Sequence, residues 1–347
     1  MQFAAYATTR EPVDGLYVQR ATLGGTHRFR VASGEVELRL PPIEAAKTSD
    51  AERRVSLVQD PDNAEHTWFE PAYLSIRLDL DEPVTFAGSE DHFNGIEVVR
   101  SKSASRTFDQ VQASLAEALD RWKRTLRWVG LAPEICFSEI RTSRDATRRR
   151  GFKVFRASDD ALFRGHGGSL TMPGGGEITT AAWEQVGIAL ARDESPPLWM
   201  DYLMTAWRLY RVGDLRTAAV NAAISCETAL RALFASTLPT IASPVAIKIL
   251  DNVSVQQLLT KVNELAQWTK QECKAHQQSA VHELFDLRNA IMHSGLNEPD
   301  TLATVARLLP KVTSFVLAVD QSLSAASGQP SVLLPGADAI RRITTVD

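Results

Sequence analysis

The chain has 347 residues, of which 44% are hydrophobic and 23% charged, and its net charge is −4. This composition is ordinary for a folded globular protein, and the length suggests two domains. The small net charge gives no global indication of nucleic-acid or membrane binding, and three widely spaced cysteines imply no disulfide framework.

Neither a secretion signal nor a membrane anchor is expected. The first residues have no apolar core of signal-peptide length. The most apolar helix candidate is interrupted by Glu227 and Arg231, and no run approaches the ~20 residues that span a bilayer. We therefore expect a cytoplasmic protein without membrane contact.

The first part of the chain reads mainly as strands. Apolar residues alternate with polar ones over 16–18, 27–31, 36–40 and 74–80. From about 107 to 129 the apolar spacing changes to about 3.6 residues, which predicts one long helix. Short strands are expected to resume at 135–137 and 152–155.

Two glycine-rich stretches follow, at 165–168 and 173–176. Such loops can cradle a phosphate through their backbone amides. However, the Gly-Lys-Ser/Thr ending of a P-loop and the glycine spacing of a dinucleotide fold are both missing. We interpret these stretches as turns of an interdomain linker that ends at residue 178.

Beyond the linker the pattern is helical throughout. Helices are predicted over 181–191, 198–210, 215–234, 255–268, 275–293 and 301–323. Asn252 or Ser254 is expected to cap the fourth, and Pro299-Asp300 to open the last. The fold class is therefore α+β: a β-rich N-terminal domain (1–178), an all-α helical bundle (179–325) and a C-terminal tail (326–347).

A group of polar residues lies near the end of the helix predicted at 275–293. Asn289 and His293 are four residues apart, so they share one helix face. Arg288 lies about 140° around the axis from His293, at 3.6 residues per turn. Arginine binds phosphate bidentately and histidine transfers protons near neutral pH, so this combination suits phosphate chemistry.

The same helix has features of an ordinary helix end. Leu284, Leu287 and Ile291 are predicted to form its apolar stripe, with Ser294 and Gly295 ending it. In the alternative interpretation the polar group is a surface triplet. His293 would then cap the helix C-terminus, and Arg288 would pair with Glu283 or Asp286.

An Arg followed by four residues and a His, late in a helical segment, resembles the motif of the HEPN superfamily. An apolar helix with Ala223, Glu227, Leu230 and Phe234 precedes the motif helix, and an amphipathic helix follows it, which is also similar to HEPN proteins. The resemblance covers about residues 179–325. Many HEPN proteins are metal-independent endoribonucleases whose site assembles from two copies of the motif in a homodimer; others are inactive scaffolds or nucleotide binders.

The chemistry of metal-free RNA cleavage suggests a role for each motif residue, and the apolar surroundings of Glu227 suggest one for its carboxylate. His293 would move a proton during attack of the ribose 2′-hydroxyl, and Arg288 would stabilise the phosphorane. Asn289 would orient the phosphate or the imidazole. Glu227 would be a supporting residue that pairs with Arg288, or alternatively an edge residue paired with Arg231.

A metal site is not expected. Cys273 and His276 could offer two ligands on one helix face, but His282 lies off that face and no carboxylate-rich partner motif exists. We interpret all three as solvated helix residues and expect neither a metal nor another cofactor.

A basic stretch runs from residue 121 to 164. Twelve Lys and Arg minus five Asp and Glu give it a charge of +7, whereas residues 181–325 have twelve against fourteen, or −2. The densest part, with Arg148, Arg149, Arg150 and Lys153, is expected to contact the RNA backbone. The alternative is a solvated helix face and loop.

Together these features predict an endoribonuclease that cleaves RNA as a homodimer. The HEPN resemblance implies a defence or toxin-type role, and the N-terminal domain is expected to sense a regulator that the sequence does not identify. The alternative is an inactive HEPN scaffold that dimerises or binds nucleotides or RNA. Some HEPN toxins are modified on a Tyr two residues after the His. Gly295 stands at that position, so this control is not expected.

Overall fold

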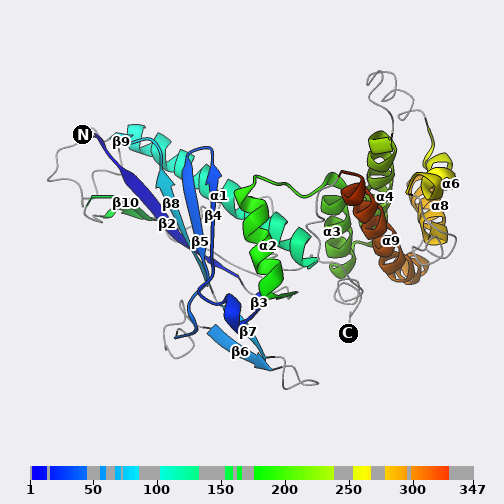
Figure 1. Cartoon of the computed structure of the whole chain (residues 1–347), viewed down its shortest axis with the longest axis horizontal. Coiled ribbons are helices and arrows are strands. Elements are labelled where there is room, and N and C mark those ends of the chain that lie inside the picture. The colour runs from blue at the N-terminus through cyan, green and yellow to red at the C-terminus, as the bar shows by residue number, and fades with distance from the viewer. Residues whose placement is uncertain are drawn as a thin grey trace. The chain divides into compact units, whose positions relative to one another are not determined.

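The computed structural model describes residues 2–13, 16–44, 55–59, 67–71, 73–85, 102–132, 153–158, 162–165, 176–237, 253–266, 278–294 and 298–327. The chain forms two compact units, Met1–Ser195 and Pro196–Asp347. The first is built around antiparallel sheet and the second is helical, which confirms the predicted α+β class (Figure 1).

A six-stranded antiparallel sheet forms the centre of the first unit. Its order is β11-β10-β2-β8-β5-β4. The strands are β2 (Ala5–Pro12), β4 (Thr26–Val31), β5 (Gly34–Arg39), β8 (Tyr73–Leu80), β10 (Lys153–Arg156) and β11 (Leu162–Gly165). The strands predicted at 27–31, 36–40, 74–80 and 152–155 correspond to β4, β5, β8 and β10.

Two smaller sheets complete the described strands. One has the order β12-β3-β7-β6 and is antiparallel except for the parallel pair β12–β3. Its strands are β3 (Leu16–Gln19), β6 (Val55–Gln59), β7 (Thr67–Pro71) and β12 (Gly176–Ile178), and a 3-10 turn, η1 (Arg20–Thr22), follows β3. The other sheet pairs β1 (Gln2–Phe3) with β9 (Val84–Thr85).

One face of the large sheet is apolar because its strands alternate. In β8, Leu74, Ile76 and Leu78 are buried, while Arg77 and Asp79 between and beyond them are exposed. The long helix α1 (Lys102–Gly130), predicted from about 107, lies along the sheet (Figure 1). It buries an apolar stripe formed by Val111, Leu115, Leu119, Trp122 and Leu126.

The helix α2 (Thr180–Ala191) belongs to the first unit and not to the helical one. It packs on α1 and β4, and its Trp183 stacks on His27 with ring centroids 4.0 Å apart. Thr180 also hydrogen-bonds Thr22 through their hydroxyls, 3.1 Å apart. The boundary predicted after residue 178 is therefore one helix too early, because helical periodicity does not say which unit a helix packs on.

The second unit is a bundle in which α4 packs against every other described helix. Its members are α3 (Leu198–Arg211), α4 (Leu215–Thr237), α6 (Val255–Leu265), α8 (Gln278–Ser294) and α9 (Glu298–Ser327). Ser254, one of the two predicted caps, forms a capping box with Gln257. The last helix begins at Glu298, so Pro299 lies in its first turn, where its missing N–H has no helical partner to lose.

Tryptophans join α3 to α9. Trp207 donates from its indole nitrogen to the Thr313 hydroxyl at 2.9 Å, and Trp199 donates to the Asp320 carboxylate at 2.8 Å. Burial raises the pKa of Asp320, and the Trp199 hydrogen bond opposes that rise.

Two predictions fall wholly or mostly on residues that the structure does not describe. The strand predicted at 135–137 is one. The other is the tail predicted at 326–347, of which residues 326 and 327 belong to α9 and the rest lies outside the described residues. Among the helices that are described, none combines the length and apolarity needed to cross a bilayer.

One buried histidine, His27 of β4, connects this strand to α1 and α2 in the core of the first unit. His27 is 3% exposed; its Nδ1 accepts a hydrogen bond from the Trp122 indole at 3.2 Å, and its Nε2 donates to the Trp183 carbonyl at 2.9 Å. Gly187 lets α2 approach, since a Cβ there would lie 3.0 Å from the imidazole. Burial lowers the pKa of His27 from 6.5 to about 4, because a buried imidazolium is poorly solvated.

This arrangement predicts acid sensitivity of the first unit. The unfolded chain binds a proton at His27 below pH 6.5, whereas the folded chain binds it only near pH 4. Stability is therefore lost as the pH falls through this window, by about 3 kcal/mol when the titration is complete. Urea unfolding at pH 7 and pH 4.5 should show the loss, and His27→Gln should reduce it.

The exposed His282 provides the control, because His282→Gln removes an imidazole without disturbing a core contact. This variant should keep the wild-type pH dependence. An equal loss of stability in wild type and His27→Gln would contradict the role of His27.

Candidate functional site

The helix α8 has one buried and one exposed side. Ala280, Val281, Leu284, Phe285 and Leu287 are buried. On the opposite side His282, Asp286, Asn289 and His293 are exposed, at spacings of four, three and four residues. The predicted apolar stripe is thus confirmed for Leu284 and Leu287, whereas Ile291 near the helix end is only half-buried.

Two of the three motif residues, Arg288 and Asn289, contact one another near the C-terminal end of this helix. Arg288 begins on the core side and is half-buried, but its Nη1 donates to Asn289 Oδ1 at 3.1 Å. The guanidinium therefore bends toward the face that carries Asn289 and His293. His293 lies in the last turn, where the helix macrodipole favours a cation. Gly295, the predicted residue past the helix end, lies outside the described residues.

Neither of the two carboxylates suggested as partners of Arg288, Glu283 and Asp286, pairs with it. Glu283 instead binds Arg307 of α9, with Arg307 Nη1 donating to Glu283 Oε2 at 2.9 Å. This hydrogen bond lowers the pKa of Glu283. Asp286 has no ion pair or hydrogen bond within the described part of the chain. Within the described part of the chain, no carboxylate therefore pairs with the Arg288 guanidinium.

Glu227 does not support the motif. Its Oε1 lies 2.7 Å from Arg231 Nη2, one helical turn along α4, and its side chain is 33% exposed. Of the two interpretations, the pairing with Arg231 is the one observed, and the predicted contact with Arg288 is not formed between these two residues. The carboxylate reaches water at the edge of the buried stripe, so it needs no second cation.

Part of the basic stretch is built into the fold. Arg121 donates from Nη2 to the Leu190 carbonyl at 2.7 Å and from Nη1 to the Arg30 carbonyl at 3.1 Å, and it pairs with Asp193 at 2.8 Å. Lys123 is only 7% exposed. These two cations are thus not an RNA-contact surface, contrary to what the charge count suggested.

The densest part of that stretch lies mostly outside the described residues, where Arg148, Arg149 and Arg150 fall. Lys153 is the first residue of β10, in register with Thr8 of β2. The structure therefore does not test whether these four predicted RNA-binding residues form one surface.

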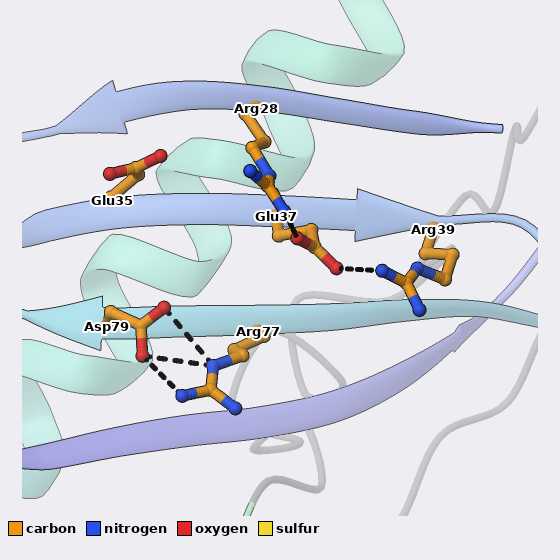
Figure 2. Close-up of a pocket in the computed structure, with 6 residues that line it drawn as sticks. All are labelled: Arg28, Glu35, Glu37, Arg39, Arg77 and Asp79. Carbon is orange, nitrogen blue, oxygen red and sulfur yellow. Dashed lines mark hydrogen bonds and ion pairs between the residues drawn. The ribbon is translucent and has the colours of Figure 1, made fainter. Parts of the chain in front are cut away.

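A charged hollow of about 560 Å³ on the open face of the sheet was not anticipated (Figure 2). Its lining residues come from β4, β5 and β8: Arg28, Glu35, Glu37, Arg39, Arg77 and Asp79. The outward positions of alternating strands would have indicated it, since Arg28 and Glu37 are directly opposed across β4 and β5.

The charges in this hollow largely satisfy one another. Glu37 binds both Arg28, at 2.6 Å, and Arg39, at 2.9 Å, and Arg77 binds Asp79 at 2.8 Å while lying over the Tyr6 ring. Three arginines balance three carboxylates, so the hollow has no net charge to attract a polyanion. Cross-strand pairs of this kind are usual on a solvated sheet face.

Metal and thiol chemistry receive no support from the described residues. Cys273 and His276 lie outside them, and His282 is exposed on α8. No group of three or more His, Cys, Asp or Glu within the described ranges could hold a metal ion. Cys226 is fully buried, and burial raises the pKa of its thiol, so it would be a poor nucleophile.

Neither a family model, nor a curated protein, nor a solved structure matches the chain.

Neighbouring residues of α8 should respond to substitution in opposite ways. Leu287 is 9% exposed, so Leu287→Ala should cost about 2–5 kcal/mol of stability, because it leaves a cavity against the bundle. Asn289→Ala on the exposed face should change stability by about 0.5 kcal/mol or less. Chemical denaturation of both variants measures this, and a comparable loss in Asn289→Ala would show that this face is packed.

Proposed function

We propose that the helical unit is a HEPN-like, metal-independent endoribonuclease that acts as a homodimer. The observation that carries this proposal is the Arg288–Asn289 hydrogen bond. It turns an otherwise core-side guanidinium toward the exposed face of His293 without engaging a carboxylate. A cation, an amide and an imidazole at one exposed helix end suit the binding and cleavage of a phosphodiester.

The proposed reaction is an attack of the ribose 2′-hydroxyl on the adjacent phosphorus. One His293 accepts the 2′-hydroxyl proton and the His293 of the second copy protonates the departing 5′-oxygen. The bond from phosphorus to that oxygen breaks, and a 2′,3′-cyclic phosphate forms. Arg288 stabilises the charge on the phosphorane. Asn289 accepts from Arg288 through Oδ1, so its amide N–H groups remain able to orient a phosphate oxygen.

The alternative is an inactive HEPN-like scaffold that dimerises or binds nucleotides or RNA. The same exposed face could bind a nucleotide without cleaving it. We favour the enzyme because Arg288, Asn289 and His293 are all present and all reach the same helix end. A defence or toxin-type role in the cytoplasm is part of the same proposal and rests on the HEPN resemblance alone.

Cleavage should be independent of metal. Purified protein incubated with mixed RNA should act equally with and without EDTA, and should leave 2′,3′-cyclic phosphate and 5′-hydroxyl ends. Analysis of the termini by phosphatase and kinase treatment identifies them. Activity that disappears with chelator and returns with a divalent ion would rule this mechanism out.

His293→Ala and Arg288→Ala should each abolish turnover while leaving the fold nearly intact. Since both residues act on one phosphorane, the double variant should be no slower than either single variant. His282→Ala is the matched control, because it removes an exposed imidazole from the same helix, and it should keep full activity. Equal cleavage by wild type and His293→Ala would favour the scaffold.

The basic stretch of the first unit is proposed to hold the RNA. Replacing Arg148, Arg149 and Arg150 with Ala should weaken RNA binding and flatten its salt dependence, because fewer counterions are released. Fluorescence anisotropy at several salt concentrations measures both quantities. If affinity and salt slope are unchanged, the RNA path lies elsewhere.

A further inference from the structure

The exposed side of α8 has the spacing of a helix-pairing seam. Asp286, Asn289 and His293 follow one another at three and four residues, which is the spacing by which two helices contact along a line. Met292, one residue before His293, is 60% exposed. A single exposed apolar residue is ordinary on a protein surface, so the case for pairing rests on the charges along the line.

This seam is complementary to itself in only one direction. If two copies of α8 lie antiparallel about a two-fold axis near Asn289, each Asp286 faces the His293 of the other copy, because both residues are three to four positions from the centre. In a parallel pair each Asp286 would face its own equivalent, and like charges would repel. Charge therefore selects the antiparallel pair.

The same arrangement places the two His293 residues on either side of Asn289 along one seam. Seven residues separate Asp286 from His293, which places the two His293 backbones about 10 Å apart along the seam, at 1.5 Å per residue. The Arg288 guanidinium already bends toward this side through Asn289.

We propose that Asp286 is a positioning residue supplied in trans: its carboxylate accepts a hydrogen bond from the His293 imidazole of the second copy. One ring nitrogen is then held by the carboxylate and the other is left for proton transfer, as in other imidazole–carboxylate pairs. Asp286 is available for this contact because it has no partner within the described part of its own chain. The proposal rests on the proposed homodimeric function and adds the register and a supporting residue to it.

A charge exchange tests the contact without measuring cleavage. Asp286→Arg and His293→Asp should each raise the dissociation constant of the homodimer by roughly tenfold or more. The first replaces the acceptor of the imidazole N–H by a cation that can only donate, and the second places two carboxylates opposite one another. A mixture of the two variants should dimerise within about threefold of wild type. In that heterodimer the introduced arginine of one copy faces the introduced aspartate of the other, and the second contact keeps its native residues. Analytical ultracentrifugation of the full chain measures all three constants.

His282→Asp is the matched control for this experiment. It makes the same chemical change on the same exposed face, but the position opposite it in the proposed register lies beyond Ser294, where α8 ends. Its dissociation constant should stay within about twofold of wild type.

A second measurement addresses positioning itself. Asp286→Asn should lower kcat by roughly tenfold, because a general base or acid that is no longer oriented loses efficiency. It should leave KM nearly unchanged, since Asp286 does not contact RNA. Glu283→Gln, which removes a carboxylate from the same helix, should leave kcat unchanged.

The outcomes separate this proposal from the ribonuclease. A monomeric wild type, or charge variants that dimerise as wild type does, would overturn the contact even if RNA is cleaved. Restored association in the mixture with no cleavage by wild type would support the contact and overturn the enzymatic function.

Discussion

The burial of the apolar stripe of α8 determines which polar side chains this helix exposes to a ligand. Leu284 and Leu287 pack into the bundle, so the rotation of the helix about its axis is set by their burial. That rotation places Asn289 and His293 in water and leaves Arg288 on the wrong side. The hydrogen bond to Asn289 corrects this by drawing the guanidinium around the helix. The proposed site of three polar residues would thus depend on hydrophobic packing one turn away.

The sequence predicted the helices and four strands of the large sheet, β4, β5, β8 and β10, because burial imposes a period on both kinds of element. It missed β2 in the middle of the large sheet, since the inward positions of that strand are Ala5, Ala7 and Thr9. Small side chains differ little in hydrophobicity from the residues at the outward positions, so the sequence of this strand shows no clear alternation of apolar and polar residues. The positions of Asn289 and His293 on the exposed side of α8 could be predicted because they lie on one helix, where spacing alone predicts the faces.

Contacts between distant elements could not be read in the same way. Glu227 had two plausible cations, and only the packing of α4 shows that Arg231 is the one it meets. The basic stretch was counted as if every cation were solvated. Arg121 instead satisfies two backbone carbonyls, and Lys123 is covered. A charge count along the sequence overestimates the positive charge of the surface whenever cations bind backbone groups inside the fold.

The Arg121 contacts have a consequence for how the two units are linked. By binding the Leu190 carbonyl and Asp193, this side chain ties the end of α2 to the first unit. The connection therefore begins only after Asp193 and stops at Pro197, the cap of α3. Its four residues, 194–197, include two prolines and reach at most about 14 Å. In the proposed homodimer the two N-terminal units would be held on short tethers, so a polymeric RNA bound by both would gain avidity from the high effective concentration of the second.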